Sequence, residues 1–509
     1  MKKSITALVA ICLMFLSITA VNAFDYPDEQ WMPSGPPTEA SSYGMELRAG
    51  GNEPANPYSY IMNFKTDGYV MQQSKVLDVK ECKSLTSAEC AKPGWLNYVA
   101  LLGMCDSTNT VDCVESISAK KEDGTDLPVT YAGNFPLDNI REYKGNSNLN
   151  LPNGKSSFLL DIPGAPHKAG STYLVNATMF GFKGPSMAKF KPIRFSLAVN
   201  AVSIETGNFL PAQQSLENSD YNRLGPGMDV GWKGVSKCAQ SSATQCAAKQ
   251  SLPTDIVFSA KLRLKTKING WLYGRASNVD AAVSTDSKGI QRVEISGRPV
   301  ISPSIFGWVE KANAPKSLVS FYNKMSDFDF RKGSGYPNES LLRYFNPEED
   351  YSLSEMALWL PILKDTAAAA PTYWHFMTME HGFANSCLSS DSKLIGIVNT
   401  NASGFKYGPP EFNKKLGTLD YKVLAPHYLP DGSTFQGSYD LWIDASVARC
   451  IYGFTSAPIT ATVSIVTDKS TTIISTSTVK ATSKFIKLGA YGFTFSNPTL
   501  RVKLTQKKK

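Results

Sequence analysis

The chain has 509 residues, of which 42% are hydrophobic and 19% charged, and its formal net charge at pH 7 is +8. This composition excludes an intrinsically disordered chain and a membrane protein with many spans, and the length allows about three domains. The positive charge is thinly spread, which favours contact with acidic glycans or wall polymers over nucleic acid.

The first 23 residues have the pattern of a secretory signal peptide. Lys2 and Lys3 supply the positive start, residues 5–20 are mainly apolar, and Ala23 ends a small-residue cleavage site. The apolar stretch is shorter than the roughly 20 residues that a spanning helix needs. We therefore expect a mature protein that is secreted or held at the cell surface, with no transmembrane segment.

Patterning along the mature chain predicts a mainly β protein. Short apolar runs alternate with turn signals over most of its length, and helical periodicity is confined to one section. The expected fold is a set of multi-domain, antiparallel β-sandwich-like modules with a small helical insertion. The predicted sections are an extended lead-in (24–43), an N-terminal β domain (44–206), a second β domain (207–314), the helical insertion (315–371) and a C-terminal β-sandwich-like domain (372–509).

Eight cysteines follow the signal peptide, and six of them repeat one spacing. Three pairs are separated by seven mostly polar residues: Cys82 and Cys90, Cys105 and Cys113, Cys238 and Cys246. In a helix each pair would lie about 12 Å apart, too far for a disulfide, so the spacing predicts loops. We expect three disulfide-closed hairpin tips, each worth about 2.5 kcal/mol of chain entropy, and a long-range bond between Cys387 and Cys450.

Two other arrangements of the cysteines are considered. Zinc ligands usually lie two to four residues apart, so a spacing of seven does not fit a zinc site. A nested pairing of Cys82 with Cys113 and of Cys90 with Cys105 is the main alternative among disulfides.

Four cations alternate with apolar residues in the second β section. On a strand, Lys261, Arg263, Lys265 and Lys267 would lie on one face roughly 6.6 Å apart. This face is a candidate site for a polyanion, and a solvated outer face explains the same pattern.

Three further binding candidates follow the cationic run. Trp271, Tyr273 and Arg275 would form a sugar-stacking platform with an arginine clamp if the strand continued straight. However, the intervening Asn-Gly pair at 269–270 predicts a two-residue hairpin, which would turn these side chains toward the apolar side. Core packing is thus the alternative to ligand stacking.

The helical insertion carries the acidic candidates. An amphipathic pattern begins near 318, and a capping box at Ser352 and Glu355 predicts a second helix that Pro361 should end. A carboxylate pair for glycan hydrolysis would come from Asp327, Asp329, Glu348 and Asp350. The alternatives are a structural cation site and plain surface residues, of which the surface positions are favoured.

Histidines gather only once in the sequence. His375, Glu380 and His381 lie close together, but their spacing matches no known zinc-protease pattern. We expect structural roles for them, and loop positions for His167 and His427.

Four stretches of the C-terminal half resemble secreted, functionally uncharacterised bacterial proteins of the actinobacterial type. They are Gly270–Ala276, Asn399–Ser403 with Tyr407–Glu411, Ala425–Ser433, and Tyr439–Thr455 with Tyr491–Thr505. The resemblance covers about residues 255–509. It implies export and a shared C-terminal half, and it carries no catalytic residues.

Familiar nucleophile and nucleotide motifs are missing from the sequence, which has no Gly-x-Ser-x-Gly elbow, no phosphate loop and no dinucleotide fingerprint. We therefore expect no cofactor and no metal site. The favoured function is attachment or surface structure through glycans or anionic wall polymers, and the alternative is a secreted polymer hydrolase with a carboxylate pair.

Overall fold

The fold is described from a computed structural model. The described residues are 42–47, 58–66, 76–91, 94–138, 141–207, 238–242, 244–332, 343–344, 352–378, 386–390, 393–406, 408–455, 459–466, 471–473, 477–482, 484–495 and 499–506. The predicted signal peptide lies outside them. Only the last two residues of the predicted lead-in are included, and they open the first strand.

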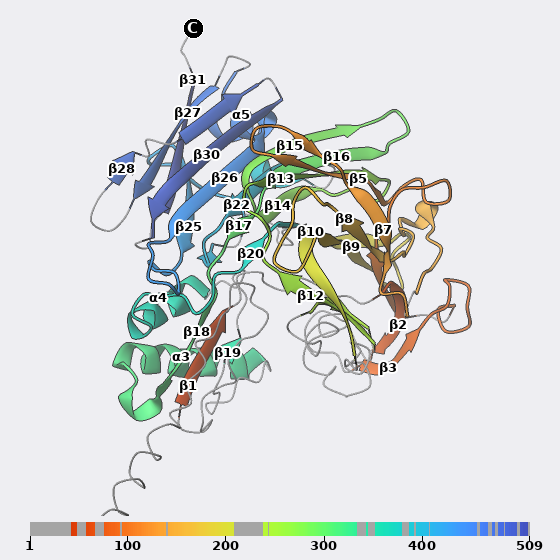
Figure 1. Ribbon diagram of the computed structural model, residues 1–509, viewed down its shortest axis with the longest axis horizontal. Coiled ribbons are helices and arrows are strands. Elements are labelled where there is room, and N and C mark those ends of the chain that lie inside the picture. The colour runs from red at the N-terminus through yellow and green to blue at the C-terminus, as the bar shows by residue number, and fades with distance from the viewer. Residues whose placement is uncertain are drawn as a thin grey trace, which may run out of the picture.

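One long sheet runs through the whole molecule. Its main path follows the order β29 (Ser477–Ala481), β30 (Phe485–Thr494), β26 (Gln436–Asp444), β22 (Leu394–Thr400), β14 (Gly270–Arg275), β21 (His375–Thr378), β10 (Lys191–Thr206), β9 (Thr172–Lys183), β4 (Trp95–Leu101), β2 (Tyr60–Thr66) and β3 (Val76–Glu81). Four more strands join beside β9 and β10: β7 (Thr130–Phe135), β8 (Ser157–Asp161), β11 (Cys238–Ser241) and β12 (Gln245–Gln250). The sheet connects the orange and yellow strands of the N-terminal half with the blue strands of the C-terminal half (Figure 1).

A five-stranded sheet covers one face of the long sheet. Its order is β15 (Ser277–Thr285), β16 (Gln291–Arg298), β13 (Ile256–Leu264), β5 (Cys113–Lys121) and β6 (Asp126–Leu127). Alternate residues of β13, such as Phe258 and Leu262, are buried against Val175 and Leu197 of the long sheet. This packing is a β-sandwich, as the alternating pattern predicts.

A six-stranded sheet covers the opposite face at the C-terminal end. Its order is β23 (Gly404–Phe405), β25 (Thr418–Leu424), β31 (Thr499–Gln506), β27 (Ile459–Val466) and β28 (Thr471–Ile473), with β24 (Glu411–Asn413) beside β25. The sequence predicts a small sandwich at this end of the chain, and the structure has one: β26 and β30 share a core with the six-stranded sheet. Its second layer is not separate, because β26, β29 and β30 belong to the long sheet. The helix α5 (Ala445–Tyr452), which the sequence analysis missed, follows β26.

The middle of the long sheet is therefore buried on both faces. In β22, Ile397 belongs to the core beneath the five-stranded sheet, and its neighbour Val398 belongs to the core beneath the six-stranded sheet. In β14, Leu272 and Tyr273 divide in the same way. Strands buried on both faces lose the polar alternation of a sheet with one wet face, which explains the continuous apolar runs here.

The helical insertion packs against a small third sheet. This sheet has the order β18 (Ile305–Glu310), β1 (Ser42–Leu47) and β19 (Arg343–Tyr344), and the helices are α3 (Lys316–Lys332) and α4 (Ser352–Ile362). Both helices are confirmed, and α4 ends one residue after Pro361 because proline cannot continue the helical hydrogen bonds. A two-stranded ladder, β17 (Val300–Ile301) with β20 (Thr372–Tyr373), connects this region to the sandwich.

The four disulfides are those predicted. The bonds are Cys82–Cys90, Cys105–Cys113, Cys238–Cys246 and Cys387–Cys450. The first three close short loops at strand ends, and the fourth links the turn at 386–388 to α5. The nested alternative is therefore wrong.

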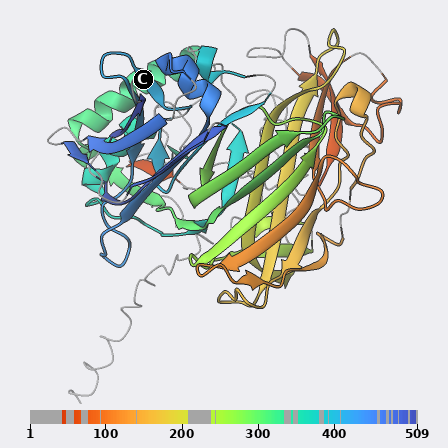
Figure 2. The same ribbon diagram turned by 90° about the horizontal axis from the view of Figure 1, so that it is seen from above.

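The predicted sections share their sheets. β5, from the section 44–206, pairs with β13, from the section 207–314, and β1 pairs with β18. Seen from above, the orange and yellow strands gather on one side, and the C-terminal strands, the helices and β1 gather on the other (Figure 2). Among the described helices, none combines the length and apolar character needed to cross a bilayer.

Candidate functional site

The predicted cationic strand is β13 and the segment after it. Lys261 and Lys265 are exposed, and Arg263 and Lys267 are half-buried. The residues between them are buried, so the predicted alternation of faces is confirmed.

Neighbouring groups engage most of these cations. The Nζ of Lys261 lies 3.6 Å from the carboxylate of Glu294 on the adjacent strand β16. Arg263 pairs with Glu115 on the other side, in β5. The Nζ of Lys265 donates a 3.1 Å hydrogen bond to a backbone carbonyl at 288. The outer face of the five-stranded sheet thus alternates in sign, which is typical of a solvated sheet surface.

A disulfide loop docks at the end of the cationic strand. Asp112, from the loop closed by Cys105 and Cys113, accepts hydrogen bonds of 2.8 Å from the backbone N–H groups of Lys265 and Thr266. Burial raises the pKa of the Asp112 carboxyl, and the two N–H groups oppose this rise. The interaction ties two segments about 150 residues apart in sequence, so this end of the strand is a structural joint.

The three aromatic and arginine candidates lie in the interior. Trp271, Tyr273 and Arg275 are at most 4% exposed. As a surface platform for a ligand they are therefore a wrong prediction, and the alternative of core packing is confirmed. Trp271 donates from Nε1 to the carbonyl of Leu388, and the hydroxyl of Tyr273 lies 3.1 Å from the sulfur of Met377.

Arg275 binds backbone instead of a ligand. Its guanidinium donates to the carbonyl of Thr400 at 2.8 Å, to that of Ala402, and to that of Ser403 at 3.3 Å. It also lies 4.9 Å from the ring centre of Phe405. The side chain therefore holds the turn between β22 and β23, and its charge is spread over carbonyl oxygens and one aromatic face.

The hairpin predicted at 269–270 is wrong. Gly270 does adopt a left-handed φ of 70°, as a turn requires. However, β13 pairs with β5 and β16, whereas β14 pairs with β21 and β22. The turn passes the chain from the five-stranded sheet to the long sheet, so the aromatic residues enter a second core.

Asp327 and Asp329 belong to α3, not to the extended strand in which the sequence analysis considered them. Glu348 and Asp350 lie outside the described residues, so the predicted carboxylate pair stays a prediction.

The histidines that are described have structural surroundings. His375 is 1% exposed and meets the rings of Tyr273 and Tyr373 edge to face. His167 and His427 lie in loops, as predicted. Glu380 and His381 lie outside the described residues, and within the part of the chain that the structure describes, no three His, Cys, Asp or Glu side chains are placed to hold a metal ion.

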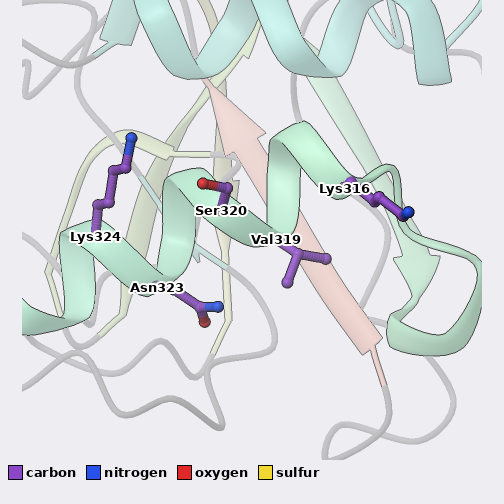
Figure 3. A pocket seen from close by; sticks show the side chains of 5 residues that line it. All are labelled: Lys316, Val319, Ser320, Asn323 and Lys324. Carbon is purple, nitrogen blue, oxygen red and sulfur yellow. The ribbon is translucent and has the colours of Figure 1, made fainter.

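A hollow on α3 was missed by the sequence analysis. It has a volume of about 390 Å³ and is lined by Lys316, Val319, Ser320, Asn323 and Lys324, which project from successive turns of the helix (Figure 3). These positions follow the spacing i, i+3, i+4, i+7 and i+8 and thus form one helix face. That spacing is the signal that could have identified the face.

The charge of the hollow is positive. Lys316 and Lys324 are exposed and lie eight residues apart, which is about 12 Å along the helix axis. Within the described residues, neither lysine has a carboxylate or another hydrogen-bonding partner. Ser320 and Asn323 lie between the lysines and add a hydroxyl and an amide group.

The other face of α3 holds the helix in place. Leu318 is fully buried, and the hydroxyl of Tyr322 donates a 2.7 Å hydrogen bond to the carboxylate of Glu355 in α4. Trp359 of α4 donates from Nε1 to the same hydroxyl at 2.8 Å. The lysine-bearing face is therefore presented from an anchored helix.

No family model matches the chain, and no curated protein matches it.

Proposed function

We propose that this protein is an exported, disulfide-stapled attachment protein that binds anionic glycans or wall polymers at the cell surface. Four disulfides fit an oxidising compartment, and the first 23 residues have the pattern of an export signal. The proposed ligand class follows from charge, because a mildly basic chain without dense Lys/Arg clusters suits acidic polymers better than nucleic acid.

The observation that carries the proposal is the lysine pair of the α3 hollow. Lys316 and Lys324 lie about 12 Å apart along the helix axis, and neither has a counter-ion among the described residues. A linear polymer with regularly spaced phosphates or carboxylates can meet both at once. The hydroxyl of Ser320 can hydrogen-bond its sugar or phosphate oxygens between the lysines.

The interior supports a scaffold that presents such a face. Its buried charges bind parts of the chain itself, as Arg275 does with the carbonyls at 400–403 and Asp112 with the amides at 265–266. Groups used in this way fix one segment of the chain to another. No contact among the described residues favours the alternative of a hydrolase.

The test is retention of the mature protein on wall and polysaccharide fractions across a salt series. We expect retention to weaken as salt rises, because exposed charges are screened. The double variant Lys316→Gln and Lys324→Gln should lower retention several-fold at low salt.

The matched control removes two lysines from the cationic strand. The double variant Lys261→Gln and Lys265→Gln changes the net charge equally but leaves α3 intact, so it should retain nearly normal binding. Equal losses in both variants would mean that only total charge matters. Retention that does not change across the salt series would rule out electrostatic attachment.

A further inference from the structure

The third sheet has one face toward the helices and one face turned away from them. Met45 of β1 and Ile305 of β18 form a core with Leu318 of α3. Because side chains alternate along a strand, Phe306 and Trp308 of β18 lie on the opposite face. Trp308 and the helix α3 are therefore on different sides of this sheet.

Trp308 is the most exposed tryptophan among the described residues. It is 43% exposed, whereas Trp271, Trp359, Trp374 and Trp442 are at most 5% exposed. Burial of an indole is strongly favourable, so the fold gives up a large gain in stability at this position. Aromatic side chains are enriched at contact surfaces and in ligand sites, which makes Trp308 a candidate contact residue.

The indole of Trp308 is held by a neighbouring ring and keeps its polar group free. The ring centres of Trp308 and Phe306 lie 5.7 Å apart, with an interplanar angle of 71°. Gly44 stands opposite Trp308 on β1, so the directly opposite position carries no side chain that could cover the indole. On its other side, β18 is the edge of the sheet as described. Within the described part of the chain, the indole N–H has no hydrogen-bond acceptor.

Two polar side chains follow Trp308. Glu310 lies on the same face of β18, about 6.6 Å further along the strand. The amide of Asn313, in the turn η3 (Lys311–Asn313), donates a 3.3 Å hydrogen bond to the carboxylate of Glu310. Both side chains are exposed. The second carboxylate oxygen and the amide oxygen can therefore accept hydrogen bonds from a ligand.

These groups match the chemistry of an uncharged sugar ring. The C–H groups on one face of such a ring pack against an aromatic plane, and its hydroxyls both donate and accept hydrogen bonds. The carboxylate of Glu310 repels phosphates and other carboxylates. The cation next in sequence, Lys311, lies 5.5 Å from the ring centre of Tyr43, which packs on the core between the sheet and the helices. The charge beside Trp308 is thus negative, which favours a neutral ligand.

We propose that Trp308, Glu310 and Asn313 form a binding site for an uncharged sugar unit of an extracellular polysaccharide. The sugar ring stacks on the indole, and its hydroxyls bind the indole N–H, the carboxylate and the amide. This site goes beyond the proposed function, because its ligand is neutral and it lies on the other side of the third sheet from α3. Its failure would leave the proposal for the lysine pair untouched.

The experiment is affinity electrophoresis of the mature protein in native gels that contain dextran, mannan or hydroxyethylcellulose. We expect at least one of these uncharged polymers to retard the protein, and the retardation to persist in high salt because no opposite charges are paired. Trp308→Ala should weaken the retardation several-fold, and Trp308→Phe should keep part of it. No retardation by any of the three polymers, or equal retardation of the natural protein and Trp308→Ala, would overturn the proposal.

Two control variants separate this site from other surfaces. Tyr428→Ala removes another exposed aromatic side chain, which is 40% exposed and lies outside the third sheet, and should be retarded like the natural protein. The double variant Lys316→Gln and Lys324→Gln should also keep the retardation, because the ligand is uncharged. If Trp308→Ala does not fold, Glu310→Ala replaces it, and unchanged retardation of that variant would contradict the site.

Fluorescence quenching gives a second readout of the same contact. Iodide should quench the exposed indole of Trp308, so the difference in quenching between the natural protein and Trp308→Phe reports on this residue. The polymer that retards the protein should protect this component from iodide. If Trp308→Ala changes only the oligomeric state, measured by sedimentation, the indole contacts a second copy of the chain and the sugar site is wrong.

Discussion

Two arginines twelve residues apart illustrate two uses of charge in this protein. Arg263, on the outer face of β13, pairs with Glu115 across the strand and remains partly in water. Arg275, at the end of β14, is 1% exposed and binds three backbone carbonyls. The two lie on strands of different sheets, and burial alone decides how much each contributes to stability.

The comparison distinguishes ion pairs at the surface from buried charges that hold two segments of the chain together. A partly exposed ion pair gains little, since water and salt compete for both charges. A buried guanidinium cannot be removed without leaving its acceptors unpaired in the core. Substitutions of buried and of exposed charges should therefore differ widely in their effect on stability.

The largest loss is expected for Arg275→Met. Methionine fills a similar volume but leaves the carbonyls of Thr400, Ala402 and Ser403 without their donor. We expect the unfolding free energy to fall by about 3–5 kcal/mol, measured by urea unfolding. Arg275→Lys keeps the charge but loses the forked geometry of the guanidinium. Its unfolding free energy should lie between those of the natural protein and Arg275→Met. A loss below 1 kcal/mol for the methionine variant would mean that the turn after β22 does not depend on this arginine.

A smaller loss is expected for Asp112→Ala. This buried carboxylate accepts from two backbone N–H groups at 265 and 266, which would be left unpaired. We expect a decrease of about 2–3 kcal/mol in the same measurement. The matched control is Asp106→Ala in the same disulfide loop, whose exposed carboxylate bonds only within its own turn. Equal losses would show that the loop, and not its contact with β13, is what matters.

Local patterns predicted the elements of this fold better than their partners. The alternation of β13, the ends of α4 and the three short-range disulfides depend on nearby residues or on repeated spacing, so the sequence reveals them. The partners of β14 are β21 and β22, more than 100 residues further along the chain. No local signal contains that information, which explains the wrong hairpin at 269–270.

The candidate site residues show the same difference between local pattern and long-range partners. The cations of β13 were placed on the correct face, but Glu115 and Glu294 reach them from β5 and β16, and only the assembled sheet brings these acids close. In the sequence alone, the aromatic residues of β14 resemble a ligand-stacking platform. Only the assembled fold shows the second core that buries them. The α3 face follows a helical period, but its importance comes from the absence of acidic partners among the described residues, which is a property of the fold.

The smallest effect is expected for the outer pair itself. A double-mutant cycle of Arg263→Gln and Glu115→Gln should give a coupling below about 1 kcal/mol, because both side chains are partly exposed. Arg292 also contacts Glu115, with 3.0 Å between its Nη1 and the carboxylate, so it can replace part of the lost attraction.

The response of this pair to pH supplies a second check. The hydrogen bond and charge of Arg263 lower the pKa of Glu115. A lowered pKa in the folded state means that the coupling is present above the unfolded value and is lost as the pH falls through the folded one. We therefore expect the coupling to disappear in acid and to shrink in high salt. A coupling energy above 2 kcal/mol that does not change with salt would mean that Arg263 behaves like a buried charge. The contrast with Arg275 would then be wrong.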